Sequence, residues 1–249
     1  ITGPDGRPLA AQRPLVRRIL GLELLPHPPR PAGPPRLLVV IAEPADQARF
    51  GARRVHDFLL DQLRPLAEKG LVAIDFLPPL ASPATLKQAL ISKRYDILHF
   101  VGHGHLGGLV LEGKTGESVP IGAGRLRSLI RGKGVRLILL TSCLTGAMED
   151  DLASGLATTL IEAGVSGVVA LQFPALVEEA LEFVGDVYRA MAGEWRRPVA
   201  EAVWEARRGG YFEQEHYRWG VPVVYLQDEN LDLFAQVGEG QSESLPVTL

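Results

Sequence analysis

Two side chains in this sequence are suited to nucleophilic chemistry, and each follows a run of aliphatic residues. His103 comes directly after the run 96–101 and Gly102, and Cys143 comes after the run 135–141 and Ser142. A free thiol has a pKa of about 8.5 and is mostly protonated at neutral pH, but a neighbouring imidazole can take its proton. The resulting thiolate attacks acyl carbon atoms. The pair therefore predicts a catalytic dyad with Cys143 as nucleophile and His103 as general base.

Neighbouring residues extend this prediction and offer competing assignments. Gly104 lets the backbone approach a substrate, and its N–H, with that of Cys143, is expected to form an oxyanion hole. His99 is about 13 Å from His103 along a strand, so we expect a hydrogen-bonded core histidine. His105 is the alternative general base, and His103 with His105 and Cys143 is an alternative zinc site. No further acid on that loop completes such a site, so we expect neither a metal nor a cofactor.

The order of the aliphatic runs predicts how these residues meet. Strands are expected at 37–41, 71–77, 96–101, 135–141, 165–171 and 221–226, with a short segment at 108–112, and helices at 47–69, 83–93, 124–131, 152–163, 176–192 and 198–208. This alternation predicts an α/β fold whose mostly parallel sheet of about six strands has helices on both faces. Sites in such sheets lie at the carboxyl ends of strands, so neighbouring strands would bring His103 and Cys143 together. Pro222 predicts an edge position for the last strand.

Composition limits the classes of protein to consider. The formal net charge is −3, which is too balanced for nucleic acid to be the main partner. No apolar run is long enough to cross a membrane, and Cys143 is the single cysteine, which favours a reducing compartment. We therefore expect a cytoplasmic protein with no membrane partner.

The distribution of proline separates an N-terminal segment from the rest of the chain. Nine of the 19 prolines lie in residues 1–35, so this segment is expected to be an extended linker with a possible short strand at 14–20. Residues 36–234 are expected to form the domain, and 235–249 a disordered tail. Because the chain starts at Ile1, we expect a piece of a longer protein. We expect this piece to have weak or no activity until its upstream region is engaged.

Several of these segments carry a resemblance to a known family. The segments that carry it are 96–104, 137–143, 155–157, 160–165, 168–174, 200–207 and 219–222. Through them the chain resembles the CHAT family of caspase-like proteins, which are related to separases, metacaspases and caspases. The resemblance implies a caspase-like three-layer sandwich and the hydrolysis of peptide bonds in an intracellular regulatory or defence protein. It places the general base at His103 and the nucleophile at Cys143. It also implies an upstream helical-repeat or sensor domain in the same polypeptide.

The resemblance also implies where a substrate side chain is recognised. The residue before the scissile bond (P1) would enter a pocket built by the segment after the fifth strand, with Phe173, Val177 and Glu178. Val177 stands where many relatives have an acid, so we expect an uncharged, apolar P1 residue rather than Arg or Lys. Glu178 would replace that acid only if the loop shifts by one residue.

Two other functions compete with the peptidase. One is a non-catalytic interaction module on the same fold, and the other is a small-molecule binder or a different cysteine hydrolase. The glycines at 102 and 104 are too few to indicate a phosphate-binding loop.

Overall fold

The computed structural model describes residues 12–18, 33–105, 107–143, 152–171, 177–194, 196–213, 222–228, 230–234 and 247–248. The strands are β1 (Arg36–Ala42), β2 (Ala73–Phe76), β3 (Ile97–His105), β4 (Gly108–Glu112), β5 (Ser118–Gly122), β6 (Leu137–Cys143), β7 (Gly167–Leu171), β8 (Pro222–Leu226) and β9 (Val247–Thr248). The helices are α2 (Ala52–Glu68), α3 (Pro83–Ser92), α4 (Ala123–Ile130), α5 (Leu152–Glu162), α6 (Val177–Ala192) and α7 (Val199–Glu213).

These strands form a single, mostly parallel sheet in the order β8-β7-β6-β3-β1-β2-β9. All neighbours from β7 to β9 are parallel, and β8 is antiparallel to β7 at the end of the order. The hairpin β4–β5 pairs with the last residues of β3. The predicted α/β sheet is therefore confirmed, as is the edge position of the strand with Pro222.

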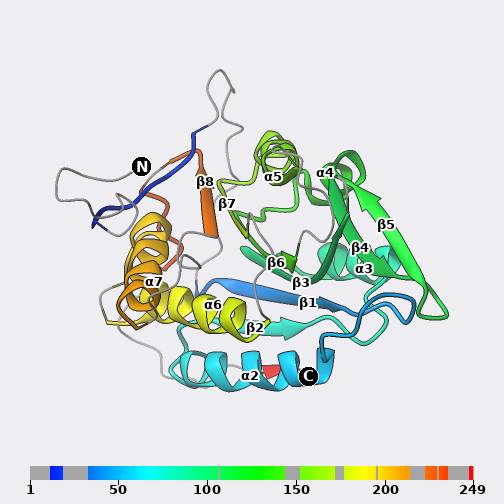
Figure 1. Cartoon of the computed structure of the whole chain (residues 1–249), viewed down its shortest axis with the longest axis horizontal. Helices are drawn as coiled ribbons and strands as arrows, with labels where there is room; N and C mark the ends of the chain where they lie inside the picture. The colour runs from blue at the N-terminus through cyan, green and yellow to red at the C-terminus, as the bar shows by residue number, and fades with distance from the viewer. Residues whose placement is uncertain are drawn as a thin grey trace.

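Helices cover the sheet in two layers (Figure 1), and alternate residues of the central strands pack against one layer or the other. On β1, Leu37 and Val39 pack with α2, α6 and α7, whereas Leu38 and Val40 pack with α3, α4 and α5. The same alternation holds on β3 and β6. Burial on both faces explains why the strands read as continuous aliphatic runs. Within the described residues, no helix has the length and apolar character needed to cross a membrane.

Two segments outside the predicted domain 36–234 pair with the sheet. The N–H of Arg17 donates to Val224 O (2.8 Å), and Arg17 O accepts from the N–H of Leu226 (3.2 Å). This single bridge replaces the possible strand at 14–20. Val247–Thr248 pair with β2, so the prediction of a disordered tail is wrong for these two residues. The other residues of 235–249 and most of 1–35 lie outside the described residues.

Candidate active site

The ends of β3 and β6 bring the predicted dyad together. The two strands are direct neighbours, and His103 is paired in register with Cys143. Adjacent strands are about 4.8 Å apart, and residues paired in register in a parallel sheet lie on the same face. The face is that of α2, α6 and α7, because Val101 belongs to the core on that side. Both residues lie within their strands, because β3 and β6 extend past the predicted ends at 101 and 141 to His105 and Cys143. The side chain of Cys143 lies outside what the structure describes.

His103 is held by a backbone group from a distant loop. Its side chain is buried, with the residue 8% exposed, and Nε2 lies 2.7 Å from the carbonyl oxygen of Ala48. A carbonyl oxygen only accepts hydrogen bonds, so the proton of the neutral imidazole is on Nε2 and Nδ1 keeps its lone pair. The ring of Phe50 meets the imidazole edge-on, with centroids 5.6 Å apart. Ala48 could not be identified from the sequence, because the contact uses its backbone alone.

Two glycines flank His103 on β3, and close packing explains the first of them. A Cβ atom at Gly102 would lie 2.8 Å from Ala42 O on β1 and 2.9 Å from the Phe100 ring, so this position admits no side chain without displacing the backbone. Gly104 pairs with Leu109 of β4 and is partly exposed. Its predicted part in an oxyanion hole stays a prediction.

The two other histidines near the dyad occupy opposite environments. His99 is fully buried, with Nε2 2.9 Å from Thr141 Oγ1, whose own hydroxyl donates to Phe100 O (3.1 Å). Burial lowers the pKa of His99 to about 3. The prediction of a core histidine is thus confirmed, whereas His105 is exposed at the end of β3. Among the described residues, no three His, Cys, Asp or Glu side chains gather as a metal site would require.

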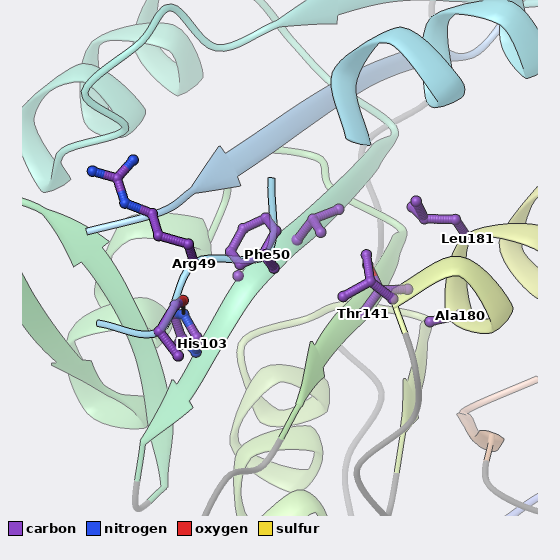
Figure 2. A pocket seen from close by; sticks show the side chains of 10 residues that line it. Arg49, Phe50, His103, Thr141, Ala180 and Leu181 are labelled. Carbon is purple, nitrogen blue, oxygen red and sulfur yellow. Dashed lines mark hydrogen bonds between the residues drawn. The ribbon is translucent and has the colours of Figure 1, made fainter. Parts of the chain in front are cut away.

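A pocket of about 140 Å³ opens beside His103 (Figure 2). Its lining is mainly apolar and comes from the loop 48–50, from β3 and β6, and from the start of α6. The lining residues are Ala48, Arg49, Phe50, Val101, Gly102, His103, Thr141, Val177, Ala180 and Leu181.

The structure separates the predicted pocket residues. Val177 shares the pocket with His103. Glu178 does not line it: the carboxylate is 54% exposed and lies 2.9 Å from Arg54 of α2. Phe173 lies outside the described residues. Arg49, which the sequence did not single out, is the one charged residue among the lining residues, and Figure 2 shows its side chain extending away from Thr141 and Leu181.

Solved structures with similar folds include cysteine proteases. The Arg-specific cysteine proteinase gingipain R aligns with a TM-score of 0.55 and 14% identity, over 79% of this chain and 47% of that chain. The complex of the pro- and mature domains of Porphyromonas gingivalis RgpB aligns with a TM-score of 0.55 and 13% identity, over 80% and 48%. The Drosophila initiator caspase Dronc aligns with a TM-score of 0.50 and 12% identity, over 90% and 98%. The chain thus spans about half the length of the gingipain chains, and at these identities the likeness establishes the fold.

The family is established by sequence. No curated protein matches the chain, but the model of the CHAT domain matches residues 2–225. The match starts well before residue 36, so the proline-rich segment that was expected to precede the domain is included in it. With most of its residues matched and a caspase-like sheet, the chain belongs to the CHAT domain family.

Proposed function

We propose that this chain is a cysteine endopeptidase in which Cys143 is the nucleophile and His103 the general base. The observation that carries this proposal is the register pairing of His103 with Cys143 at the ends of two neighbouring parallel strands. The hydrogen bond to Ala48 O supports it, because it leaves Nδ1 of His103 as the nitrogen that can accept a proton.

The residues then act in a defined order. Nδ1 of His103 takes the proton of Cys143 Sγ, and the thiolate forms a bond to the carbonyl carbon of the scissile peptide. The backbone N–H groups of Gly104 and Cys143 stabilise the oxyanion that develops. The C–N bond breaks as the imidazolium of His103 returns the proton to the leaving amine. Water, deprotonated by His103, then cleaves the thioester and restores the thiol.

Ala48 has a part in each proton transfer. Its carbonyl oxygen, 2.7 Å from Nε2, accepts a hydrogen bond from His103 in both the neutral and the protonated ring. This bond fixes the orientation of the ring and stabilises the positive charge that appears on it.

The pocket favours an apolar P1 side chain. Its described lining contains Phe50, Val177 and Leu181 but no carboxylate, so a buried Arg or Lys would have no counter-charge. We therefore propose uncharged, apolar P1 residues in a peptide or protein substrate.

The test of the dyad uses Cys143→Ala, His103→Ala and His105→Ala. We expect the first two variants to abolish cleavage of a peptide library, and Cys143→Ala also to abolish labelling by a thiol-reactive peptide. His105→Ala is the matched control and should retain activity, because this histidine is exposed at the end of β3. Cleavage by the Cys143→Ala variant would exclude the mechanism. Loss of activity in His105→Ala with activity retained in His103→Ala would move the general base to His105.

A further inference from the structure

Glu43 follows β1 directly and carries a mostly buried carboxylate, 10% exposed. Its Oε1 accepts hydrogen bonds from the backbone N–H groups of Phe50 (2.6 Å), Gly51 (2.6 Å) and Ala52 (3.3 Å). Its Oε2 lies 3.5 Å from Arg49 Nη1. Burial raises the pKa of Glu43, but these N–H groups and Arg49 outweigh burial and hold the pKa below its ordinary value. The side chain is therefore a carboxylate at neutral pH.

The N–H groups that Glu43 binds lie at the start of α2. The first N–H groups of a helix have no partner within the helix and need an acceptor from elsewhere. Gly51 precedes α2 with a φ of 82° and has no side chain to supply one, and the first turn contains no acidic residue. Glu43 supplies both the acceptor and the negative charge that favour this helix end. In doing so it ties the end of β1 to the start of α2 and closes the loop 44–50.

The far side of the same loop is tied to the β4–β5 hairpin. The N–H of Ala45 donates to Gly116 O (2.7 Å), and the Ser118 hydroxyl donates to Asp46 Oδ1 (2.6 Å). Ala48 lies between this attachment and the one made by Glu43. Its carbonyl oxygen is thereby kept in hydrogen-bonding contact with His103.

We infer that Glu43 is a positioning residue for the dyad: its carboxylate holds residues 50–52 and thereby keeps the Ala48 carbonyl on Nε2 of His103. The inference rests on the proposed function, in which Nδ1 is the base. Glu43 acts at a distance, because none of its contacts is with the imidazole. Without it, the loop loses one of its two attachments and the imidazole loses the acceptor that selects its tautomer.

Activity gives the first measurement. Glu43→Ala removes the acceptor, and we expect kcat/KM to fall about 100-fold, the loss that a displacement of about 1 Å can cause at a catalytic group. Glu43→Gln keeps the shape but loses the charge-assisted hydrogen bonds, and we expect a fall of about tenfold. The matched control is Asp57→Asn, which removes a negative charge from α2 at a side chain that is 62% exposed. Equal activity in all three variants would overturn the inference.

The tautomer of His103 gives a measurement that a merely structural role would not change. It is read by nitrogen NMR of the imidazole in a Cys143→Ala background, at a pH where the ring is neutral. We expect one tautomer, protonated at Nε2, in the background protein and with Asp57→Asn. Adding Glu43→Ala should give a mixture of both tautomers. A pure Nε2–H tautomer that persists in the Glu43→Ala protein would overturn the inference.

The design separates this inference from the proposed function. If the unmutated chain neither cleaves peptide nor is labelled at Cys143 by the thiol-reactive peptide, the proposed function fails, whereas the tautomer measurement still decides the role of Glu43. If Glu43→Ala does not fold, the same spectra are recorded for the isosteric Glu43→Gln. The unmutated chain supplies a further measurement, the hydrogen-exchange protection of the Phe50 and Gly51 N–H groups. This protection should disappear as the pH falls through the lowered pKa of Glu43, and protection that is independent of pH would contradict the inference.

Discussion

His99 and His103 lie on one strand and face the same layer of helices, yet only His103 reaches the carboxyl end of the sheet. His99 is fully buried, and no hydrogen-bond partner for its Nδ1 exists among the described residues. Burial removes the ring from water and disfavours its charged form, which lowers the pKa to about 3. A histidine that cannot take up a proton is unsuited to general base catalysis, which favours His103.

Stability should therefore depend on pH through His99. The pKa is about 6.5 in an unfolded chain and about 3 in the fold, so below pH 6.5 the unfolded state binds a proton that the native state rejects. Stability is fully present above pH 6.5 and falls by about 1.4 kcal/mol per pH unit as the pH approaches 3. In His99→Leu this slope should be absent between about pH 6 and 5, as measured by urea unfolding at each pH. Equal slopes in the two proteins would contradict the assignment.

The pocket residue Val177 gives a second prediction at this scale. Val177→Asp would place a carboxylate beside the apolar side chains of Ala180 and Leu181. We expect selectivity to shift toward basic P1 residues by tenfold or more, roughly the effect of pairing a buried charge. A positional-scanning peptide library measures the shift, and Glu178→Gln is the comparison because its carboxylate pairs with Arg54 outside the pocket. An unchanged P1 profile in Val177→Asp would show that this pocket does not bind the P1 residue.

Among the elements, β3 depends on one glycine for its contact with β1. A Cβ atom at Gly102 would lie 2.8 Å from Ala42 O. A backbone oxygen in a strand cannot move away as the end of a flexible side chain can. We expect Gly102→Ala to destabilise the fold by about 1–3 kcal/mol and to reduce activity by moving His103. Gly124→Ala is the matched control, because nothing lies within 4 Å of its added Cβ on α4. That variant should be neutral or stabilised by up to about 1 kcal/mol in a thermal melt. Comparable losses in both variants would contradict the packing argument.

The sequence predicted the central strands correctly but not the start of α2 or the strand β5. The strands that carry the proposed dyad were predictable, since burial on both faces gives β3 and β6 their aliphatic runs. The helix expected from residue 47 begins at Ala52, because Glu43 caps α2 from outside the helix. Such a long-range contact has no periodic signal. β5 was not predicted, because a proline such as Pro120 is unfavourable within a strand, although the strand pairs with β4.

Residues that contribute a reactive side chain to the candidate site could be predicted from the sequence, whereas those that contribute backbone groups could not. His103 was recognisable by its residue type and its place after a strand. Ala48 was not, because any residue offers a carbonyl oxygen and only the fold shows which one is used. Arg49 and Phe50 enter the pocket from a loop far from His103 in sequence. The predicted activation by an upstream region stays a prediction.

For the whole molecule, buried carboxylates add a second pH range, more acidic than that of His99, in which the fold loses stability. Burial raises the pKa of Asp75, but Lys93, Tyr95 and Arg36 outweigh it and lower the pKa below its ordinary value, as also occurs at Glu43. A depressed carboxyl pKa contributes stability that is present above the unfolded value and lost as the pH falls through the folded one. We expect His99→Leu to retain this acid loss below about pH 4. Asp75→Asn should weaken it in the same unfolding series, and an unchanged curve would contradict the role of Asp75.

The pairing of Arg17 with β8 and of Val247–Thr248 with β2 has a consequence for solubility. Each pairing covers backbone N–H and C=O groups at an outer strand of the sheet. Bare strand edges are templates for pairing between molecules and hence for aggregation. A chain shortened to end at Phe234 would leave the outer side of β2 open. Light scattering should then show more self-association than in the full chain at equal concentration.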